Sequence, residues 1–395
     1  MNKTTIEQIE IANKRVLIRV DFNVPLTPER TVRDDTRIQG ALPTIRLAVE
    51  KGAKVILASH LGRPKGAVVP EMSLKPAAER LAELLGQPVA LAPDCIGPET
   101  EKMVSALKGG EVLLLENVRY HAGETSNDDS FAQQLAAHAD IAVNDAFGTA
   151  HRAHASNVGV ASRVKPAVAG LLMADEIDYF NRAIREPKRP VVAILGGSKV
   201  SGKINVIEAL LDKVDRIIIG GGMAFTFFRA MGHATGNSLV EEEMLDIATS
   251  ALHKATANNV EILLPVDATI AKTIDADAEI KTVNATEIPD GWMGLDVGPK
   301  TVERFSAALS DAATVVWNGP MGVFETAPFA VGTIALAKAV AASQALSVIG
   351  GGDTGAAVKQ AGVAEDVSYI STGGGAFLEL LEGKELPGIA ILDDA

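Results

Sequence analysis

The stretch VVAILGGSKVSGK, residues 191–203, joins a short apolar run to a loop that opens with two glycines and carries two lysines. An uninterrupted apolar run of this length is typical of a strand buried on both faces of a parallel sheet. The second half of the chain repeats the pattern, since strand-like runs end at the glycines of 220–222, 350–352 and 373–375. Bare backbone N–H groups at strand ends and helix N-termini suit phosphate groups.

The first half of the chain ends its strand-like runs on side chains instead of glycines. Runs at 16–20, 55–58, 112–115 and 141–143 are followed by DFN (21–23), SHLGR (59–63), ENVR (116–119) and ND (144–145). In open parallel sheets, ligands bind outside the carboxyl ends of the strands. Charged and amide side chains there suit a small polyanion, so the two halves together predict a two-substrate phosphoryl-transfer enzyme.

Helix-like segments separate these strands throughout the chain. Apolar residues recur with a spacing near 3.6 at 73–86, 130–140, 241–258 and 328–342. Such alternation predicts an α/β fold of two doubly wound, Rossmann-like parallel-sheet domains facing each other across a cleft. A chain of 395 residues also exceeds one ordinary core. We expect an N-terminal domain at 1–170, a connecting helix and linker at 171–190, a C-terminal domain at 191–378 and a final segment at 379–395.

Composition narrows the class of protein. The formal net charge of −13 argues against nucleic acid as a partner, because binding to its phosphate backbone needs a basic face. Cys95 is the single cysteine, which excludes an intrachain disulfide and fits a reducing compartment. No apolar run reaches 18 residues, and the N-terminus has no apolar signal segment. We therefore expect a cytosolic protein with no membrane partner.

Two glycine-rich loops could each be mistaken for a familiar nucleotide motif. GSKVSGK at 197–203 nearly matches the P-loop, but Ile204 stands where that motif needs a hydroxyl. The loop still suits phosphate neutralisation; the alternative is a solvated turn with two surface lysines. GGGDTG at 350–355 matches the dinucleotide motif, yet the following strand ends at Ser371 and Thr372 without the required carboxylate. Asp353 would repel a pyrophosphate unless a metal lay between them, which favours a Mg–nucleotide site; a tight turn is the alternative.

Basic residues lie in or beside the predicted loops of the first half: Arg37, His60, Arg63, Arg119 and Arg152. A surface salt bridge explains any one arginine, but four in corresponding positions indicate a shared anion pocket. We interpret His151 and His154 as polar loop residues, since nothing else has metal-ligand spacing with them. At 317–325, Met321, Val323 and Phe324 could line a base or simply pack in the core, with Glu325 accepting from sugar hydroxyls.

Ten stretches of the chain resemble the phosphoglycerate kinase family, in that family's order. They are RVDFNVP (19–25), SHLGRP (59–64), LLLENVRYH (113–121), NDAFGTAHRAHAS (144–156), ILGGSKVSGK (194–203), IIGGGMAFTF (218–227), GLDVGPKT (294–301), WNGPMGVFE (317–325), GGGDT (350–354) and STGGGA (371–376). The resemblance implies phosphoryl transfer between 1,3-bisphosphoglycerate and ADP, giving 3-phosphoglycerate and ATP, with Mg²⁺ as cofactor.

The resemblance also implies roles for residues at matching positions. The triose would contact Asp21, Phe22, Asn23, Arg37, His60, Leu61, Gly62, Arg63, Arg119 and Arg152. The nucleotide would contact Lys203, Glu325, Gly351, Gly352, Asp353 and Thr354, with Asp353 on the metal. Catalysis would use Arg37, Lys199, Gly373 and Gly374. The family further implies a monomer that closes about its connector and a C-terminal peptide that returns to the N-terminal domain. Gly355 departs from the small alanine-like residue expected there, and this affects only the first turn of its helix.

Two other functions compete with this interpretation. A non-catalytic nucleotide-binding protein of the same fold would bind ATP without turnover, although it would have no use for Arg37 and Lys199. An NAD-dependent dehydrogenase would bind NADH and need no Mg²⁺.

Overall fold

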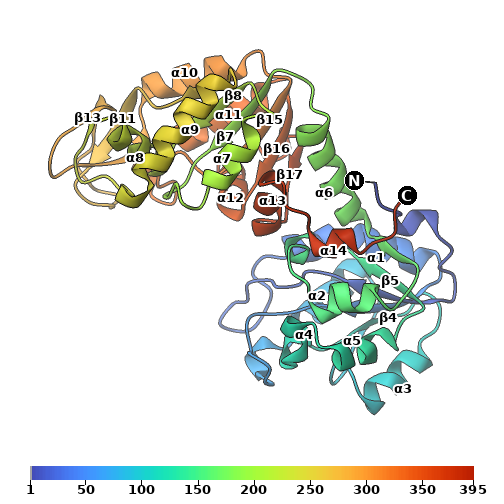
Figure 1. Ribbon diagram of the computed structural model, residues 1–395. Helices are drawn as coiled ribbons and strands as arrows, with labels where there is room; N and C mark the ends of the chain where they lie inside the picture. Colours follow the sequence, from blue (N-terminus) through green and yellow to red (C-terminus); the bar gives the residue numbers. More distant parts are fainter. Residues whose placement is uncertain (1) are drawn as a thin grey trace. The chain divides into compact units, whose positions relative to one another are not determined.

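A computed structural model describes residues 2–395 (Figure 1). The chain forms two compact units, and each is described here by itself. Unit 1 comprises Met1–Asp178 with Glu385–Ala395, and unit 2 comprises Tyr179–Lys384. The expected boundaries are 170, 190 and 378, whereas these limits fall between Asp178 and Tyr179, inside a helix (Leu171–Phe180), and between Lys384 and Glu385. Among the described residues, no helix combines the length and the apolar character needed to cross a membrane.

Unit 1 is built on a six-stranded parallel sheet in the order β3-β4-β2-β1-β5-β6. Its strands are β1 (Arg15–Arg19), β2 (Lys54–Ala58), β3 (Val89–Leu91), β4 (Val112–Leu114), β5 (Ile141–Asn144) and β6 (Ala167–Ala169). The four runs expected in this half all pair in the sheet, as β1, β2, β4 and β5. Because β1 is the first strand and lies in the middle of the sheet, the strand order reverses between β1 and β5.

Both faces of this sheet are covered, which is why its strands read as continuous apolar runs. On one face, Val16, Ile18, Val55 and Leu57 form a core with apolar residues of α1 and α2. Leu17 and Ile56, which point to the other face, are also buried. The helices are α1 (Thr36–Glu50), α2 (Lys75–Leu85), α3 (Pro98–Ala106), α4 (Gly123–Ser126), α5 (Asp129–Ala136) and α6 (Leu171–Phe180). Shorter turns are η1 (Ile6–Gln8), η2 (Pro70–Met72), η3 (Val118–Tyr120), η4 (Phe147–Thr149) and the π-turn η5 (Ala155–Gly159).

Helix α1 shows how packing overrides a local signal. Pro43 lies inside it, where proline removes a backbone donor and normally breaks a helix. Ile38, Ala41, Ile45 and Ala48 nevertheless form one buried stripe on its sheet-facing side. Burial of this stripe supplies stabilisation that intrinsic propensity lacks.

Unit 2 holds a second six-stranded parallel sheet, in the order β10-β8-β7-β15-β16-β17. Its strands are β7 (Val191–Leu195), β8 (Arg216–Ile219), β10 (Glu261–Leu263), β15 (Thr314–Asn318), β16 (Leu346–Gly350) and β17 (Tyr369–Ile370). All four runs expected here, at 191, 217, 347 and 369, are present. The two parallel sheets confirm the predicted fold class.

Smaller elements complete unit 2. An antiparallel sheet, β12-β11-β14, and a two-stranded pair, β13-β9, were not expected. Their bounds are β9 (Ala234–Thr235), β11 (Asp267–Ala271), β12 (Lys281–Asn284), β13 (Glu287–Ile288) and β14 (Met293–Val297). The helices are α7 (Ile204–Leu210), α8 (Met223–Ala230), α9 (Leu245–Ala257), α10 (Pro299–Leu309), α11 (Val331–Ala342), α12 (Gly352–Gln360) and α13 (Gly375–Leu381), with turns η6 (Asn181–Arg185, a π-turn), η7 (Glu242–Met244) and η8 (Ala327–Phe329). Trp317 and Phe305 are fully buried in the core of this unit.

The C-terminal segment belongs to unit 1. Helix α14 (Pro387–Ala390) is held from both sides: the backbone N–H of Gly388 donates to the carbonyl of Ala150 at 2.8 Å, and the Asn144 amide donates to the Gly388 carbonyl at 2.8 Å. Further along, the N–H of Thr4 donates to the carbonyl of Asp393 at 2.9 Å. Ile389 is fully buried by these contacts.

Truncating Ile389 tests whether this segment stabilises unit 1. We expect Ile389→Ala to lower the free energy of unfolding by about 2–5 kcal/mol, the usual cost of a large-to-small change in a core. Ile280, which is 49% exposed, provides the matched control, and Ile280→Ala should change stability by less than about 0.5 kcal/mol. Urea denaturation followed by circular dichroism measures both. Equal denaturation midpoints for the two variants would show that the segment is not part of the folded core.

Candidate active site

Unit 1 gathers polar side chains at the carboxyl edge of its sheet, on either side of the point where strand order reverses. Ligands of open parallel sheets bind at such an edge. After β1, Asp21 accepts from the Arg37 guanidinium at 2.8 Å. The side-chain oxygen of Asn23 accepts from the backbone N–H of Gly62, in the loop after β2, at 2.8 Å. These two contacts bring three segments that are distant in sequence to one place.

Some predicted residues at this edge serve the fold itself. Phe22 and Leu61 are buried, with Phe22 fully enclosed in the core, so a ligand could meet only their backbone. Asn144 holds α14, and the buried Asp145 accepts from the N–H of Met173 at 3.2 Å, near the start of α6. Burial raises the pKa of Asp145 to about 7. Asn144 and Asp145, at the end of β5, therefore serve the fold of unit 1.

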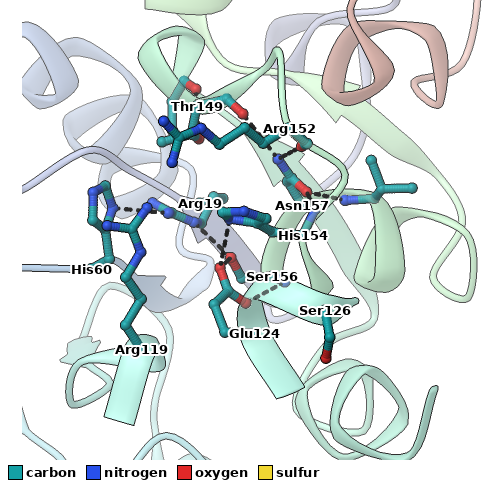
Figure 2. Close-up of polar contacts among 12 residues, drawn as sticks. Arg19, His60, Arg119, Glu124, Ser126, Thr149, Arg152, His154, Ser156 and Asn157 are labelled. Atoms are coloured by element: carbon teal, nitrogen blue, oxygen red, sulfur yellow. Dashed lines mark hydrogen bonds and ion pairs between the residues drawn. The ribbon is translucent and has the colours of Figure 1, made fainter. Parts of the chain in front are cut away.

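A buried polar network lies at the carboxyl end of β1, with Arg19 at its centre (Figure 2). Arg19 is the last residue of β1 and is 1% exposed. Its Nε donates to the Ser156 hydroxyl at 2.7 Å, and that hydroxyl donates to Glu124 at 2.7 Å. Glu124 also accepts from the N–H of Ser156 at 2.9 Å and faces His154 Nδ1 at 3.6 Å. These donors and the neighbouring Arg19 charge outweigh desolvation and lower the pKa of Glu124, which is therefore a buried anion.

Positive charge exceeds negative charge in this network. Arg119 donates to the Gly62 carbonyl at 2.8 Å, while its Nε is buried without a partner. Burial, helped by repulsion from Arg19 and Arg152, lowers the pKa of Arg119 to about 10. Glu124 and Asp21 only partly offset these guanidinium groups. Clustered cations that repel one another, with an unused buried donor among them, are an arrangement that a bound anion would stabilise.

The tautomer of His60 follows from its contact with Arg19. Arg19 Nη2 lies 3.1 Å from His60 Nδ1 inside the cluster (Figure 2). A guanidinium can only donate, so Nδ1 must accept and the ring hydrogen of neutral His60 must be on Nε2. Burial and then the nearby Arg19, Arg119 and Arg37 charges lower the pKa of His60 well below its usual value. His60 is thus a neutral hydrogen-bond donor among cations.

Two members of the predicted set in unit 1 are exposed, and one of them, Arg152, lies near Arg119. Arg63 and Arg152 are exposed, and Arg152 Nε donates to His151 Nε2 at 3.0 Å. The carbonyl of Arg152 accepts from the Asn157 amide at 2.9 Å, which fixes the backbone of that loop (Figure 2). His154 is a loop residue, as expected, and its side chain is buried against Glu124.

Sequence reasoning missed four members of the network: Arg19, Glu124, His154 and Ser156. Arg19 did carry a signal, since an arginine at the end of an otherwise apolar strand must find a buried partner. Glu124 and Ser156 carried none, because Glu124 lies 105 positions from Arg19 and only the fold brings them together.

In unit 2 the candidate site is made by loops whose backbones interlock. The N–H groups of Gly196 and Gly197 donate to the carbonyls of Asn318 and Pro320, each at 3.0 Å. A side chain on Gly196 would collide with the Pro320 carbonyl at 2.1 Å, and Gly319 adopts a φ of +102°. Glycine is required at these two positions by close approach and by backbone conformation.

Lys203, Asn318, Asp353 and Thr354 define a polar site beside these loops. The Thr354 hydroxyl accepts from the N–H of Gly319 at 2.7 Å, which joins the loop after β15 to the first turn of α12. The Asn318 amide nitrogen is buried without a partner. Burial lowers the pKa of Lys203 to about 8, although attraction to Asp353 opposes the shift. A desolvated ammonium and an unused amide donor are both suited to a phosphate.

Asp353 tests the fit of a Mg–nucleotide to this site. Its carboxylate is exposed in the first turn of α12, where Gly351 forms the N-cap with a φ of +92°. Mg²⁺ commonly binds through one or two carboxylates together with substrate phosphates. One exposed carboxylate beside Lys203 and a helix N-terminus therefore fits Mg²⁺ carried by a nucleotide.

The remaining predicted residues of unit 2 lie close to the loops already described. Lys199 is exposed, and the loop that carries it is anchored by Glu241, which accepts from the N–H and hydroxyl of Ser201 at 2.9 and 2.6 Å. Gly374 is the N-cap of α13, which packs on α7 directly after Lys203. Gly373 is buried in the same turn, and Glu325 is exposed at the end of the loop after β15. Glu241 was not foreseen from the sequence.

Comparison with known proteins decides the family. The family model described as phosphoglycerate kinase matches residues 6–384. The chain belongs to the phosphoglycerate kinase family. A phosphoglycerate kinase from Acaryochloris marina is 58% identical over the full length of both chains, and a cytosolic phosphoglycerate kinase from Triticum aestivum is 57% identical over 99% of this chain and 98% of its own.

Solved phosphoglycerate kinase structures have the same fold. The enzyme from Coxiella burnetii is 44% identical, with a TM-score of 0.90 and coverage of 98% of both chains. The enzyme from Pyrococcus horikoshii is 35% identical, with a TM-score of 0.85 and coverage of 99% of this chain and 98% of its own. These findings confirm the family resemblance seen in the sequence and, with it, a phosphotransferase whose acceptor is a carboxyl group.

The tautomer of His60 can be observed directly in this protein. We expect long-range ¹⁵N–¹H correlation spectra to show neutral His60 with its hydrogen on Nε2 at pH about 6.5, where an ordinary histidine is half protonated. The exposed His253 supplies an internal reference signal. A protonated His60 at that pH, or a hydrogen on Nδ1, would contradict the contact with Arg19.

The low pKa of Lys203 predicts a pH dependence of stability. Its pKa of about 8 in the folded chain is below the ordinary 10.5, so the unfolded chain binds more protons between these values. The free energy of unfolding contributed by this group therefore rises with pH from about 8 towards 10.5, as the buried ammonium loses its charge. Lys203→Met should lack this rise, and Lys338→Met, on an exposed side chain, should retain it. Urea denaturation midpoints, measured from about pH 7.5 to about pH 10, give the difference in stability between the variants. Parallel plots of midpoint against pH for wild type and Lys203→Met would disprove the predicted contribution of Lys203.

Proposed function

We propose that this protein catalyses reversible phosphoryl transfer between 1,3-bisphosphoglycerate and ADP, giving 3-phosphoglycerate and ATP. The observation that carries the proposal is the incompletely neutralised cation cluster of unit 1, found in a chain of the phosphoglycerate kinase family. Unit 1 would bind the triose, and unit 2 would bind the nucleotide. We also propose that the enzyme acts as a monomer in the cytosol, as the wheat relative is named cytosolic.

The triose site would combine cationic side chains with neutral hydrogen-bond donors and with acceptors. Arg119 and Arg152, with Arg63 and Arg37, would neutralise the phosphate and carboxylate groups. His60 would donate from Nε2 without adding a further positive charge to the cluster. Asp21 and Asn23 would accept from the hydroxyl group of the glycerate, and Gly62 would offer its backbone. Neutral donors and acceptors among cations let the pocket recognise a hydroxy acid as well as an anion.

The nucleotide site would rely on backbone and on two charged side chains. Gly351, Gly352 and Thr354, at the start of α12, would receive phosphate oxygens, with Lys203 beside them. Asp353 would hold Mg²⁺, which when bound neutralises phosphate charge. Glu325 would accept from the ribose hydroxyls. A nucleotide phosphate would also satisfy the buried Asn318 amide.

Phosphoryl transfer requires correctly positioned substrates and positive charge around the transferring group, and it needs no general base. The bond between phosphorus and the acyl oxygen of 1,3-bisphosphoglycerate breaks, and a bond forms from phosphorus to a terminal oxygen of ADP. The leaving carboxylate is already stable as an anion near neutral pH, so no proton must move. Arg37 and Lys199 would stabilise the charge on the transferring group, and the N–H groups at Gly373 and Gly374 would add the dipole of α13. Because the two ligands bind to different units, the proposal includes an approach of the units during turnover.

Removing either proposed catalytic cation tests this assignment. We expect Arg37→Ala or Lys199→Ala to lower kcat by roughly 10³-fold while the protein stays folded, by analogy with losses of transition-state arginines. Arg33→Ala and Lys338→Ala, on exposed side chains, are the matched controls and should keep normal turnover. A coupled assay of ATP-dependent phosphorylation of 3-phosphoglycerate, with and without Mg²⁺, provides the rates. Near-normal kcat in either test variant would remove that residue from the mechanism.

The same assay separates the competing functions. Mg²⁺-dependent turnover supports phosphoryl transfer. ATP binding without turnover would instead support a non-catalytic nucleotide-binding protein, and NADH binding without a Mg²⁺ requirement would support a dehydrogenase.

A further inference from the structure

We propose a binding site for a soft divalent metal ion, of which Zn²⁺ is the biological example, formed by Asp94, Cys95 and His121 in unit 1. A thiol sulfur, a carboxylate oxygen and an imidazole nitrogen of these residues lie within 4.8 Å of one another. Among residues 2–395 this is the one cluster of three or more such groups that could share an ion. None of the three is in the proposed triose or nucleotide sites.

The contacts within the cluster show that its atoms already converge. His121 Nε2 lies 2.7 Å from Asp94 Oδ1, and the same oxygen accepts from the N–H of Cys95 at 2.6 Å. The Cys95 sulfur lies within 4.8 Å of both the Asp94 carboxylate oxygen and the His121 nitrogen. One carboxylate thus faces both the nitrogen and the sulfur that a metal would need.

Each ligand is held in place by the surrounding fold. The His121 ring stacks on Phe131 of α5, with ring centroids 5.0 Å apart. The carbonyl of Cys95 lies 3.1 Å from His138 Nε2, a second buried contact. The loop after β3 and the end of η3 therefore present these side chains from two fixed segments, which lowers the entropic cost of forming a site.

The donor set selects the type of metal. Sulfur, nitrogen and oxygen donors suit Zn²⁺ and similar ions, whereas Mg²⁺ and Ca²⁺ prefer oxygen alone. Three protein ligands leave one tetrahedral position for water. Water can reach it, because the side chains of His121 and Asp94 are 29% and 43% exposed. Cys95 itself is buried, so the sulfur would be the interior ligand.

Binding would replace hydrogen bonds by metal–ligand bonds. The S–H bond of Cys95 breaks as the metal–sulfur bond forms, and its proton passes to solvent. His121 would coordinate through Nε2 and carry its single hydrogen on Nδ1, so the ring stays neutral. No oxidant or reductant is involved. The site would link the loop after β3 to η3, the turn that carries Arg119.

The single cysteine makes the site easy to test. We expect Co²⁺ added to the metal-free full-length protein to produce a thiolate-to-metal charge-transfer band and tetrahedral ligand-field bands, both reversed by Zn²⁺. Cys95→Ser should abolish the charge-transfer band. His121→Asn and Asp94→Asn, on partly exposed side chains, should weaken Co²⁺ binding by about tenfold or more. The exposed His253→Asn serves as the matched control and should bind as wild type does.

The outcomes separate the site from loss of folding and from the proposed activity. Circular dichroism and turnover with Mg²⁺ verify that each variant is folded, and the absorption bands do not depend on catalysis. Absence of a charge-transfer band in the folded wild type would overturn the proposal. So would equal Co²⁺ affinity in folded His121→Asn and wild type.

Discussion

Parallel strand pairing is the constraint on which both units depend. It places every strand's carboxyl end along the same edge of the sheet, so residues far apart in sequence meet there without any loop having to reach far. In unit 1, Asn23, Gly62 and Arg119 follow three different strands and still share contacts. In unit 2, the loops after β7 and β15 share backbone hydrogen bonds, and the Thr354 hydroxyl after β16 accepts from the N–H of Gly319. The cost is that both faces of each sheet must be covered, which the surrounding helices achieve.

The two units solve the problem of holding phosphate by different physical means. Unit 1 uses guanidinium groups, which must be kept near one another although they repel. Glu124 makes this possible as a buried anion, and Ser156 transmits its charge to Arg19 through two hydrogen bonds of 2.7 Å. Arg19 in turn orients His60, and burial together with the Arg19 charge keeps that imidazole neutral by lowering its pKa. The buried residues Arg19, Glu124 and Ser156, which would touch no ligand, therefore influence the charge of the residues that we propose bind the ligand, such as His60.

Unit 2 uses backbone groups and close approach. Gly196 and Gly319 allow two loops to touch, and Thr354 ties them to α12. Only a few side chains contribute to this site. They are the Lys203 ammonium with its lowered pKa, the Asp353 carboxylate and the unpaired Asn318 amide. Such a site adapts poorly to substitution, because an added Cβ meets backbone that cannot move aside.

The sequence by itself determined the long buried strands of both parallel sheets, the fold class and the family, because such strands and their loops leave local patterns at 16–20, 55–58 and 191–195. It also singled out Arg119 and Lys203, which lie just past strand ends. Only the tertiary structure decided that Arg19 and Glu124 form one network, that Asn144 and Asp145 serve the fold, and that Asp94 and Cys95 meet His121. It likewise decided that Pro43 lies within a helix. These features depend on burial and on contacts between distant segments, and the spacing of residues along the chain does not reveal either.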